Sequence, residues 1–187
     1  MRSRTRPILI ALFSAGVALG QAPSGATARS LAPYVNTPQE VVHRMLELAN
    51  VRAGETVYDL GSGDGRVLIV AASRFGAKAV GVEISERLVK ASIENLKRAG
   101  LEQMARVIHA DLMETDLSPA DVVVMYLLRD SNDLIRPKLE KSLKAGARVV
   151  SHDYEIRGWK PTATEKLDAQ KRAHSIFVYT APLSWKK

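Results

Sequence analysis

This sequence contains no cysteine among its 187 residues, which excludes disulfide bonds, thiolate metal ligands and cysteine nucleophiles. No acidic residue precedes Glu40. The uncharged apolar stretch from Ile8 to Leu19 falls short of the roughly twenty residues that a membrane-spanning helix needs. The chain is 46% apolar and 25% charged, so we expect one ordinary globular domain with a sizeable core.

The first 28 residues have the order of a secretory signal peptide. Arginines precede the apolar stretch, and small residues ending at Ala28 follow it. We therefore expect a leader over residues 1–28, a mature domain over residues 29–187, and an exported or periplasmic location. A basic amphipathic or disordered leader is the alternative.

The charge balance is mildly basic. The net charge is +7, and removing the leader's three arginines from 27 basic residues leaves 24 against 20 acidic ones. From Ser131 onward the sequence contains 12 Lys or Arg and 6 Asp or Glu. This excess of positive charge could favour an acidic partner or peripheral contact with an anionic membrane. Such an excess is more often a solvated face, and no nucleic-acid-binding module is recognisable, so nucleic acid is a disfavoured partner.

Strands and helices alternate after an extended arm over residues 29–37. Thr37 is a candidate N-cap for a first helix that begins at Pro38 and ends near Gly54. The predicted strands are Glu55–Leu60, Ala79–Glu83, Arg106–Ala110, Asp121–Leu128, Arg148–Asp153, Thr162–Leu167 and His174–Thr180. The further predicted helices are Arg66–Phe75, Glu86–Ala99 with Ser85 as N-cap, and Ser131–Leu143. This pattern predicts an α/β fold with a doubly wound, mostly parallel seven-stranded sheet and an antiparallel C-terminal strand pair.

A glycine turn joins the first strand to the next helix. Asp59 lies near the end of this strand, and glycines follow at positions 61, 63 and 65 before the helix starts at Arg66. Glycines there let a ligand lie against bare backbone at the carboxyl edge of the sheet. The spacing differs from the dinucleotide fingerprint, because the third glycine comes one residue early, and this disfavours pyrophosphate binding.

Two further acids stand at the ends of the next strands. Glu83 lies about twenty residues after the glycine turn, where an acid can accept both ribose hydroxyls, which implies an adenosine group. Asp111 follows the third strand. Each acid alone is more often a strand-end or helix-cap residue, but Asp59, Glu83 and Asp111 on three successive strand ends favour a cofactor site.

These motifs resemble those of the class I S-adenosylmethionine (SAM) dependent methyltransferases, over roughly residues 37 to 180. The resemblance implies that SAM is the methyl donor and that no metal is needed. It implies that Gly61 and Gly63 touch the methionine part, that Asp59 orients its ammonium group, and that Thr37 reaches its carboxylate. It also implies that Glu83 with Ile84 binds the ribose, and that Asp111 with Leu112 lies near the adenine.

Shorter motifs resemble bacterial relatives of the mitochondrial ATP synthase c-subunit lysine methyltransferase family. They include Pro33-Tyr34-Val35-x-Thr37-Pro38, Tyr126-Leu127-Leu128 and Ser151-His152-Asp153. This resemblance implies a lysine amine on a protein substrate as acceptor. An ammonium must lose a proton before it can be methylated, and an apolar or aromatic channel lowers its pKa. Tyr34 on the arm and Tyr126 at the fourth strand end are the candidate catalytic residues that line this channel.

The remaining polar and aromatic candidates have ordinary structural explanations. His152 and Asp153 could orient the acceptor or a water molecule, although a strand-end His-Asp pair is more often a hydrogen-bonded loop anchor. His43 and Asp64 are interpreted as surface or capping residues. Trp159 and Trp185 are expected to pack the tail.

Three functions stay open at the level of sequence. The fourth strand lacks the Asn-Pro-Pro-Tyr or Asp-Pro-Pro-Tyr turn of many nucleobase and amide methyltransferases, which leaves an aliphatic amine as the leading acceptor. A small-molecule or RNA methyltransferase is the second hypothesis, and a non-catalytic SAM-binding protein is the third. Because SAM is made in the cytoplasm, a membrane-anchored or cytoplasmic location is the alternative to export, and the oligomeric state stays open.

Overall fold

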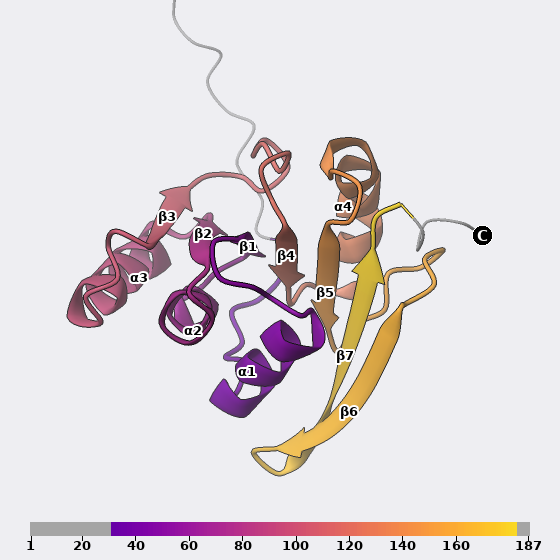
Figure 1. The fold of residues 1–187 in the computed structure, drawn as a ribbon, viewed down its shortest axis with the longest axis horizontal. Helices are drawn as coiled ribbons and strands as arrows, with labels where there is room; N and C mark the ends of the chain where they lie inside the picture. Colours follow the sequence, from indigo (N-terminus) through magenta and orange to yellow (C-terminus); the bar gives the residue numbers. More distant parts are fainter. Residues whose placement is uncertain (1–30, 183–187) are drawn as a thin grey trace, which may run out of the picture.

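The computed structural model describes residues 31–182, which are coloured along the chain in Figure 1. The predicted leader over residues 1–28 and the predicted packing of Trp185 lie outside the described residues. The expected export therefore stays a prediction. Within residues 31–182, no helix combines the length and the apolar character needed to cross a membrane.

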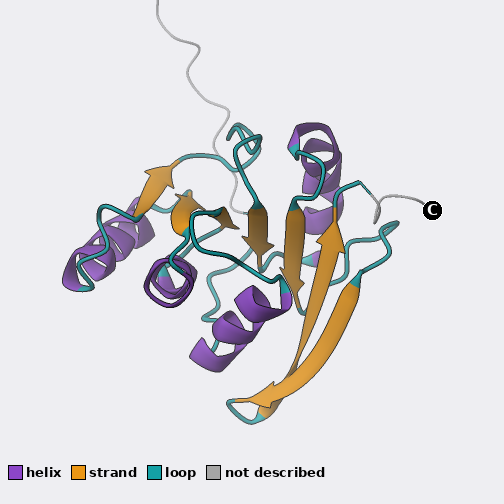
Figure 2. Cartoon of the chain, in the orientation of Figure 1, coloured by secondary structure: helices purple, strands orange, loops and turns teal. Residues whose placement is uncertain are grey.

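Seven strands, drawn in orange in Figure 2, form one sheet. Their order is β3-β2-β1-β4-β5-β7-β6, with the labels that Figure 1 gives. Strands β1 to β5 pair in parallel, whereas β7 runs antiparallel to both β5 and β6. This order confirms the predicted doubly wound fold with an antiparallel C-terminal pair. The strands are β1 Thr56–Leu60, β2 Lys78–Glu83, β3 Ala105–His109, β4 Val122–Met125, β5 Arg148–His152, β6 Ala163–Ala169 and β7 Arg172–Thr180.

Helices cover both faces of the sheet, as predicted for a parallel sheet. They are α1 Gln39–Leu48, α2 Arg66–Phe75, α3 Glu86–Arg98 and α4 Arg129–Ser142. The first three lie on one face and α4 on the other (Figure 1). Strand β4 is buried on both sides, since Val122 and Val124 belong to the core beneath α1 and α2, and Val123 and Met125 belong to the core beneath α4.

The start of α1 differs from the prediction. The helix begins at Gln39, Pro38 occupies the N-cap position, and no side chain caps the helix. The prediction that Thr37 caps this helix is therefore wrong, because the hydroxyl of Thr37 lies 3.3 Å from Nδ1 of His152 on β5. Ser85 does occupy the N-cap position of α3, but its side chain makes no capping hydrogen bond.

Strand β4 is shorter than predicted. It ends at Met125, because its pairing with β5 stops at Ser151. The three residues from Tyr126 to Leu128 therefore leave the sheet, and α4 begins at Arg129, two residues earlier than expected. This early exit places Tyr126 in a loop at the carboxyl edge of the sheet.

Two leucines of α4 allow a test of this packing. Leu139 is 0% exposed and belongs to the core beneath α4, whereas Leu134 is 53% exposed. We expect Leu139→Ala to lower the free energy of unfolding by about 2–5 kcal/mol, through lost burial and the cavity left behind. Leu134→Ala should change it by less than about 0.5 kcal/mol. Urea unfolding measures both, and equal losses would contradict the assigned face of α4.

Candidate active site

A cavity of about 290 Å³ lies at the carboxyl ends of β1 to β4, beside the N-terminal arm. Strands β1 and β4 are neighbours in the sheet although they are not consecutive, and ligands of doubly wound folds bind at such a switch point. The cavity is lined by all eight residues predicted to bind the cofactor and by both predicted channel residues. These are Thr37, Asp59, Gly61, Gly63, Glu83, Ile84, Asp111 and Leu112, with Tyr34 and Tyr126. Their contacts to a ligand stay predictions.

The glycine turn after β1 brings the arm against the cavity. The N–H of Gly61 donates to the carbonyl of Val82 on β2, over 2.8 Å. Gly63 has φ +55°, and a side chain there would collide with the ring of Tyr34. Gly65 is different, because a side chain there would collide with the hydroxyl of Ser92 on α3. The first two glycines therefore shape the cavity, and the third lets two helices approach.

Glu83 joins the loops that follow β1 and β2. Its Oε2 accepts a hydrogen bond from the N–H of Gly63 over 2.9 Å, and its Oε1 accepts one from the N–H of Ser85 over 2.8 Å. The residue is buried. Because each carboxylate oxygen has two lone pairs, both oxygens retain a site for a ligand hydroxyl. Glu83 can thus hold the turn and bind a ribose at the same time.

Asp59 is a buried carboxyl group in the cavity wall. Burial raises the pKa of Asp59 to about 8, and the nearby carboxylates of Glu83 and Asp64 add to the shift. The group is therefore mostly neutral at pH 7 without a ligand. A cationic group in the cavity would stabilise the charged carboxylate, which is the chemistry expected of a partner for an ammonium group.

An ion pair that the sequence analysis missed ties the arm to the cavity. Nη2 of Arg66 lies 2.7 Å from Oδ2 of Asp64, and Nη1 of Arg66 donates to the carbonyl of Thr37 over 2.6 Å. Burial acts to raise the pKa of Asp64, but the hydrogen bonds from Arg66 outweigh burial and lower this pKa. Asp64 therefore does more than cap or face solvent. It lines the cavity, and it orients the arginine that holds the arm.

Asp111 has a local role in the loop after β3. Its Oδ1 accepts from the N–H of Met113 over 2.8 Å, and its carbonyl accepts from the hydroxyl of Thr115 over 3.0 Å. These bonds form a turn that presents the buried side chain of Leu112 to the cavity. The third acid therefore shapes an apolar wall, which suits a flat aromatic group such as adenine.

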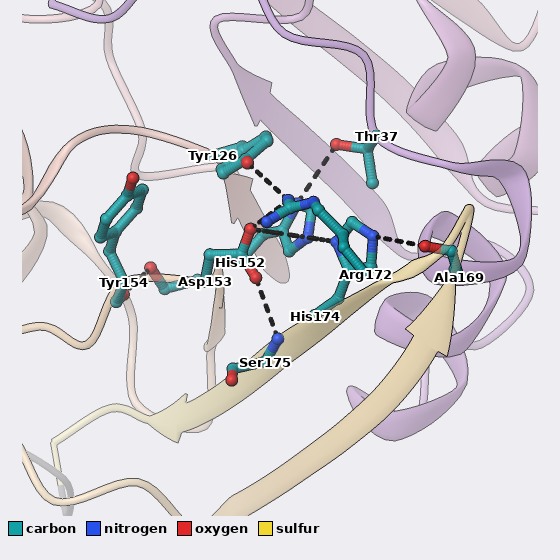
Figure 3. Close-up of polar contacts among 10 residues, drawn as sticks. Thr37, Tyr126, His152, Asp153, Tyr154, Ala169, Arg172, His174 and Ser175 are labelled. Carbon is teal, nitrogen blue, oxygen red and sulfur yellow. Dashed lines mark hydrogen bonds and ion pairs between the residues drawn. The ribbon is translucent and has the colours of Figure 1, made fainter.

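A cluster of polar side chains lies beside Tyr126 (Figure 3). It consists of His152 at the end of β5, Asp153 directly after it, and Arg172 and His174 on β7. The ring of Tyr126 lies 4.0 Å from the ring of His152, and its hydroxyl accepts from Nη2 of Arg172 over 2.9 Å. The same guanidinium nitrogen lies 2.5 Å from Oδ2 of Asp153. His152 is fully buried, and its Nε2 lies 2.9 Å from Nδ1 of His174, so it is a hydrogen-bonded residue of the core.

His174 and Arg172 were not among the site residues predicted from the sequence. Both belong to β7, and the antiparallel pairing of β7 with β5 brings them beside His152 and Asp153. Nothing in the local pattern of β7 indicates this neighbourhood. Trp159 is buried against Tyr179, which agrees with its predicted packing role, and His43 pairs with Glu47 on the outside of α1.

A family model described as the ANTKMT methyltransferase domain matches residues 59–163, more than half of the chain. The chain belongs to this methyltransferase family. A protein-lysine N-methyltransferase of Saccharolobus islandicus (strain REY15A) is 46% identical over 148 residues, which cover 79% of this chain and 92% of that protein. The adenine nucleotide translocase lysine N-methyltransferase of Mus musculus is 35% identical over 132 residues, which cover 70% of this chain and 57% of that protein.

A solved structure also resembles this methyltransferase. The crystal structure of an RNA methyltransferase from Salinibacter ruber in complex with S-adenosyl-L-homocysteine has a TM-score of 0.74 and 43% identity. The match covers 79% of this chain and 94% of that one. This methyltransferase is therefore a SAM-dependent enzyme, as predicted from the motifs after β1, β2 and β3.

The residues in the cavity fit SAM, which supplies a methyl group on a cationic sulfonium sulfur when it is bound. Asp59 offers a carboxyl group whose charged form needs a cation, and Glu83 keeps free lone pairs toward the cavity. Gly61 and Gly63 leave the backbone of the turn bare. Leu112 provides the apolar side.

The contribution of Glu83 to SAM binding can be measured by calorimetry. We expect Glu83→Ala to weaken SAM binding by about 2 kcal/mol, the size expected for hydrogen bonds to a charged group. Glu86→Ala is the matched control, since Glu86 pairs with Lys90 on the exposed side of α3. Circular dichroism should report a folded variant. Binding of NAD in place of SAM, or unchanged SAM affinity in Glu83→Ala, would refute this assignment.

The raised pKa of Asp59 predicts a pH-dependent stability without ligand. The folded-state pKa of about 8 lies above the ordinary value of 3.8, so the stability contributed by the protonated group is lost as pH rises from about 4 to about 8. The variant Asp59→Asn has no carboxyl group at this position, so its stability should not fall in this pH range through this group. We expect the free energy of unfolding of Asp59→Asn minus that of the wild type to grow by at most about 1.4 kcal/mol per pH unit, and to level off above pH 8.

Chemical denaturation at pH 5, 6, 7, 8 and 9 measures this difference. Asp116→Asn is the control, because Asp116 is an exposed aspartate whose pKa is lowered by hydrogen bonds from Ser118. Parallel pH profiles for the wild type and Asp59→Asn would mean that Asp59 is already charged in the ligand-free protein.

Proposed function

We propose that this methyltransferase transfers the methyl group of SAM to the side-chain amine of a protein lysine. Relatives that share 46% and 35% identity with the chain are named for lysine methylation. The proposal also rests on the loop after β4, which reads Met125-Tyr126-Leu127-Leu128 and lacks the Pro-Pro-Tyr turn of many nucleobase and amide methyltransferases.

The observation that carries the proposal is the aromatic and apolar wall of the cavity around Tyr126. Tyr126, Leu127 and Tyr34 all line the cavity. Arg172 donates a hydrogen bond to the hydroxyl of Tyr126, and Arg172 does not line the cavity. We therefore infer that Tyr126 faces the cavity chiefly with its ring. Ring faces suit the alkyl chain of lysine and can also attract its ammonium group.

Methyl transfer from SAM to an amine needs no covalent intermediate with the protein. The lone pair of a neutral amine attacks the methyl carbon in line with the departing sulfur, and positioning with exclusion of water supplies most of the acceleration. The apolar wall around Tyr126 favours the neutral amine, because burial penalises the ammonium form. All residues of the arm from Leu31 to Thr37 line the cavity.

RNA is the second candidate acceptor. The Salinibacter ruber protein that is 43% identical is named an RNA methyltransferase, and the second half of this chain carries an excess of basic residues. A lysine acceptor is favoured, because Tyr34, Tyr126 and Leu127 give part of the cavity an aromatic and apolar wall, and because none of the elements over residues 31–182 forms a recognisable RNA-binding module.

Methyl transfer from radiolabelled SAM decides between the acceptors. We expect transfer to poly-L-lysine, none to fully acetylated poly-L-lysine, and none to bulk RNA. Tyr126→Ala should lower the rate with poly-L-lysine at least about tenfold and leave the SAM dissociation constant within about twofold, since it removes the acceptor wall. Tyr126→Phe is the matched control, because it keeps the ring. Label in RNA alone would replace the lysine proposal.

A further inference from the structure

A buried chain of hydrogen bonds runs from the cavity to the turn between β6 and β7 (Figure 3). The hydroxyl oxygen of Thr37 lies 3.3 Å from Nδ1 of His152, and Nε2 of His152 lies 2.9 Å from Nδ1 of His174. Nε2 of His174 lies 3.3 Å from the carbonyl oxygen of Ala169. Thr37 lines the cavity, and all three side chains are at most 6% exposed.

The carbonyl at the far end sets the direction of every bond. The oxygen of Ala169 can only accept, so Nε2 of His174 carries a hydrogen, and Nδ1 of a neutral His174 is then an acceptor. Nε2 of His152 must donate to it, which leaves Nδ1 of His152 to accept from the hydroxyl of Thr37. The hydroxyl hydrogen therefore points to His152, and the oxygen lone pairs of Thr37 are left to accept a hydrogen bond from a ligand. This differs from the contact with the SAM carboxylate that the family resemblance implies for Thr37, because a hydroxyl whose hydrogen is donated to His152 cannot also donate it to a carboxylate.

The surroundings of the pair keep His152 neutral. Burial lowers the pKa of His152 to about 4, a shift that Asp153 opposes and that His174 and Arg172 increase. Asp153 stays negative, because hydrogen bonds from Ser175 and Arg172 lower its pKa against the effect of burial. His152 is thus neutral at pH 7.

Nδ1 of His174 is the last nitrogen acceptor in the chain of hydrogen bonds. It lies 3.9 Å from Oδ2 of Asp153, which also lies 3.4 Å from Nε2 of His152, so the carboxylate faces both rings. Nε2 of His174 already has the carbonyl of Ala169 as acceptor. The ring of Tyr126, which belongs to the proposed acceptor wall, packs on the ring of His152.

The same cluster could hold a metal ion by composition, since ligand atoms of His152, Asp153 and His174 lie within 4.8 Å of one another. Hydrogen bonding accounts better for its geometry. The 2.9 Å between the two imidazole nitrogens is an ordinary hydrogen-bond length, and Oδ2 of Asp153 is already paired with the cation of Arg172 over 2.5 Å. The opposite oxygen of Asp153 accepts from the N–H of Ser175.

We propose that Thr37, His152 and His174 form a relay that removes the proton from the amine acceptor before methyl transfer. The inference rests on the lysine function proposed above. The ammonium N–H is donated to the oxygen of Thr37, the proton of Thr37 moves to Nδ1 of His152, and the proton on Nε2 of His152 moves to Nδ1 of His174. The amine is left with its lone pair, and His174 becomes an imidazolium beside Asp153. Thr37 is the catalytic residue of this relay, and the two histidines act through it.

The pH dependence of kcat distinguishes a relay from a structural role. The assay uses poly-L-lysine and saturating SAM between pH 6.5 and 10. His174→Gln keeps a hydrogen-bonding side chain that cannot take up a proton. We expect it to lower kcat at pH 7 about a hundredfold, the usual size for proton-transfer catalysis. The deficit should shrink toward pH 10, where solvent itself deprotonates the amine, whose ordinary pKa is about 10.4.

Controls separate the relay from folding and from the acceptor assignment. His43→Gln changes an exposed histidine of α1 and should match the wild type at every pH. SAM affinity of His174→Gln, measured by calorimetry, should stay within about twofold. An equal loss of kcat at all pH values would overturn the relay while leaving lysine methylation intact. A wild type that methylates no amine of poly-L-lysine would remove the proposed function, and the relay with it.

A second measurement needs no acceptor. Long-range proton–nitrogen NMR of the ligand-free protein with labelled histidines, assigned through His152→Gln and His174→Gln, reports which ring nitrogens carry hydrogen. We expect hydrogen on Nε2 of both residues. Hydrogen on Nδ1 of His174 would overturn the proposed direction. Stoichiometric, micromolar binding of added ZnCl₂ that His174→Gln abolishes would assign the cluster to a metal instead.

Discussion

The carboxylate of Glu83 accepts backbone hydrogen bonds from Gly63 and from Ser85, and the rest of the site depends on this pair of bonds. They join the loop after β1 to the loop after β2 and hold the glycine turn in its conformation. The ring of Tyr34 packs where a side chain at position 63 would lie, so the same turn also receives the arm. Arg66, directly after the turn, binds the carbonyl of Thr37 and completes the attachment.

The position of the arm connects the two halves of the site. Thr37 is the last residue of the arm before α1, and its hydroxyl reaches His152 on β5. The predicted methyl donor side, built on β1, β2 and β3, is thereby joined to the proposed acceptor side, built on β4, β5 and β7. An uncompensated charge would be costly in this buried region. The site avoids one by raising the pKa of Asp59 and by pairing Asp64 with Arg66.

Much of the fold and of the donor side could be predicted from local patterns. Short apolar strands alternate with amphipathic helices, and β-strands buried on both faces carry runs such as Val122 to Val124. Residues at the carboxyl ends of parallel strands must meet at one edge of the sheet, so Asp59, Glu83 and Asp111 were expected in one cavity. The boundaries of β4 and α4 were less predictable, because β4 ends where its pairing with β5 stops rather than where its apolar run ends.

The sequence by itself thus determined the order of the elements, the glycine turn and the acids at the strand ends, since each of these depends on neighbours within a few residues or on strand direction alone. Only the tertiary structure decided the role of Thr37, which a local pattern predicts to be a helix cap. It also decided the neighbourhood of His174 and Arg172 with His152 and Asp153. That neighbourhood depends on the antiparallel register of β7 against β5, which joins residues about twenty positions apart and leaves no periodic signal along the chain.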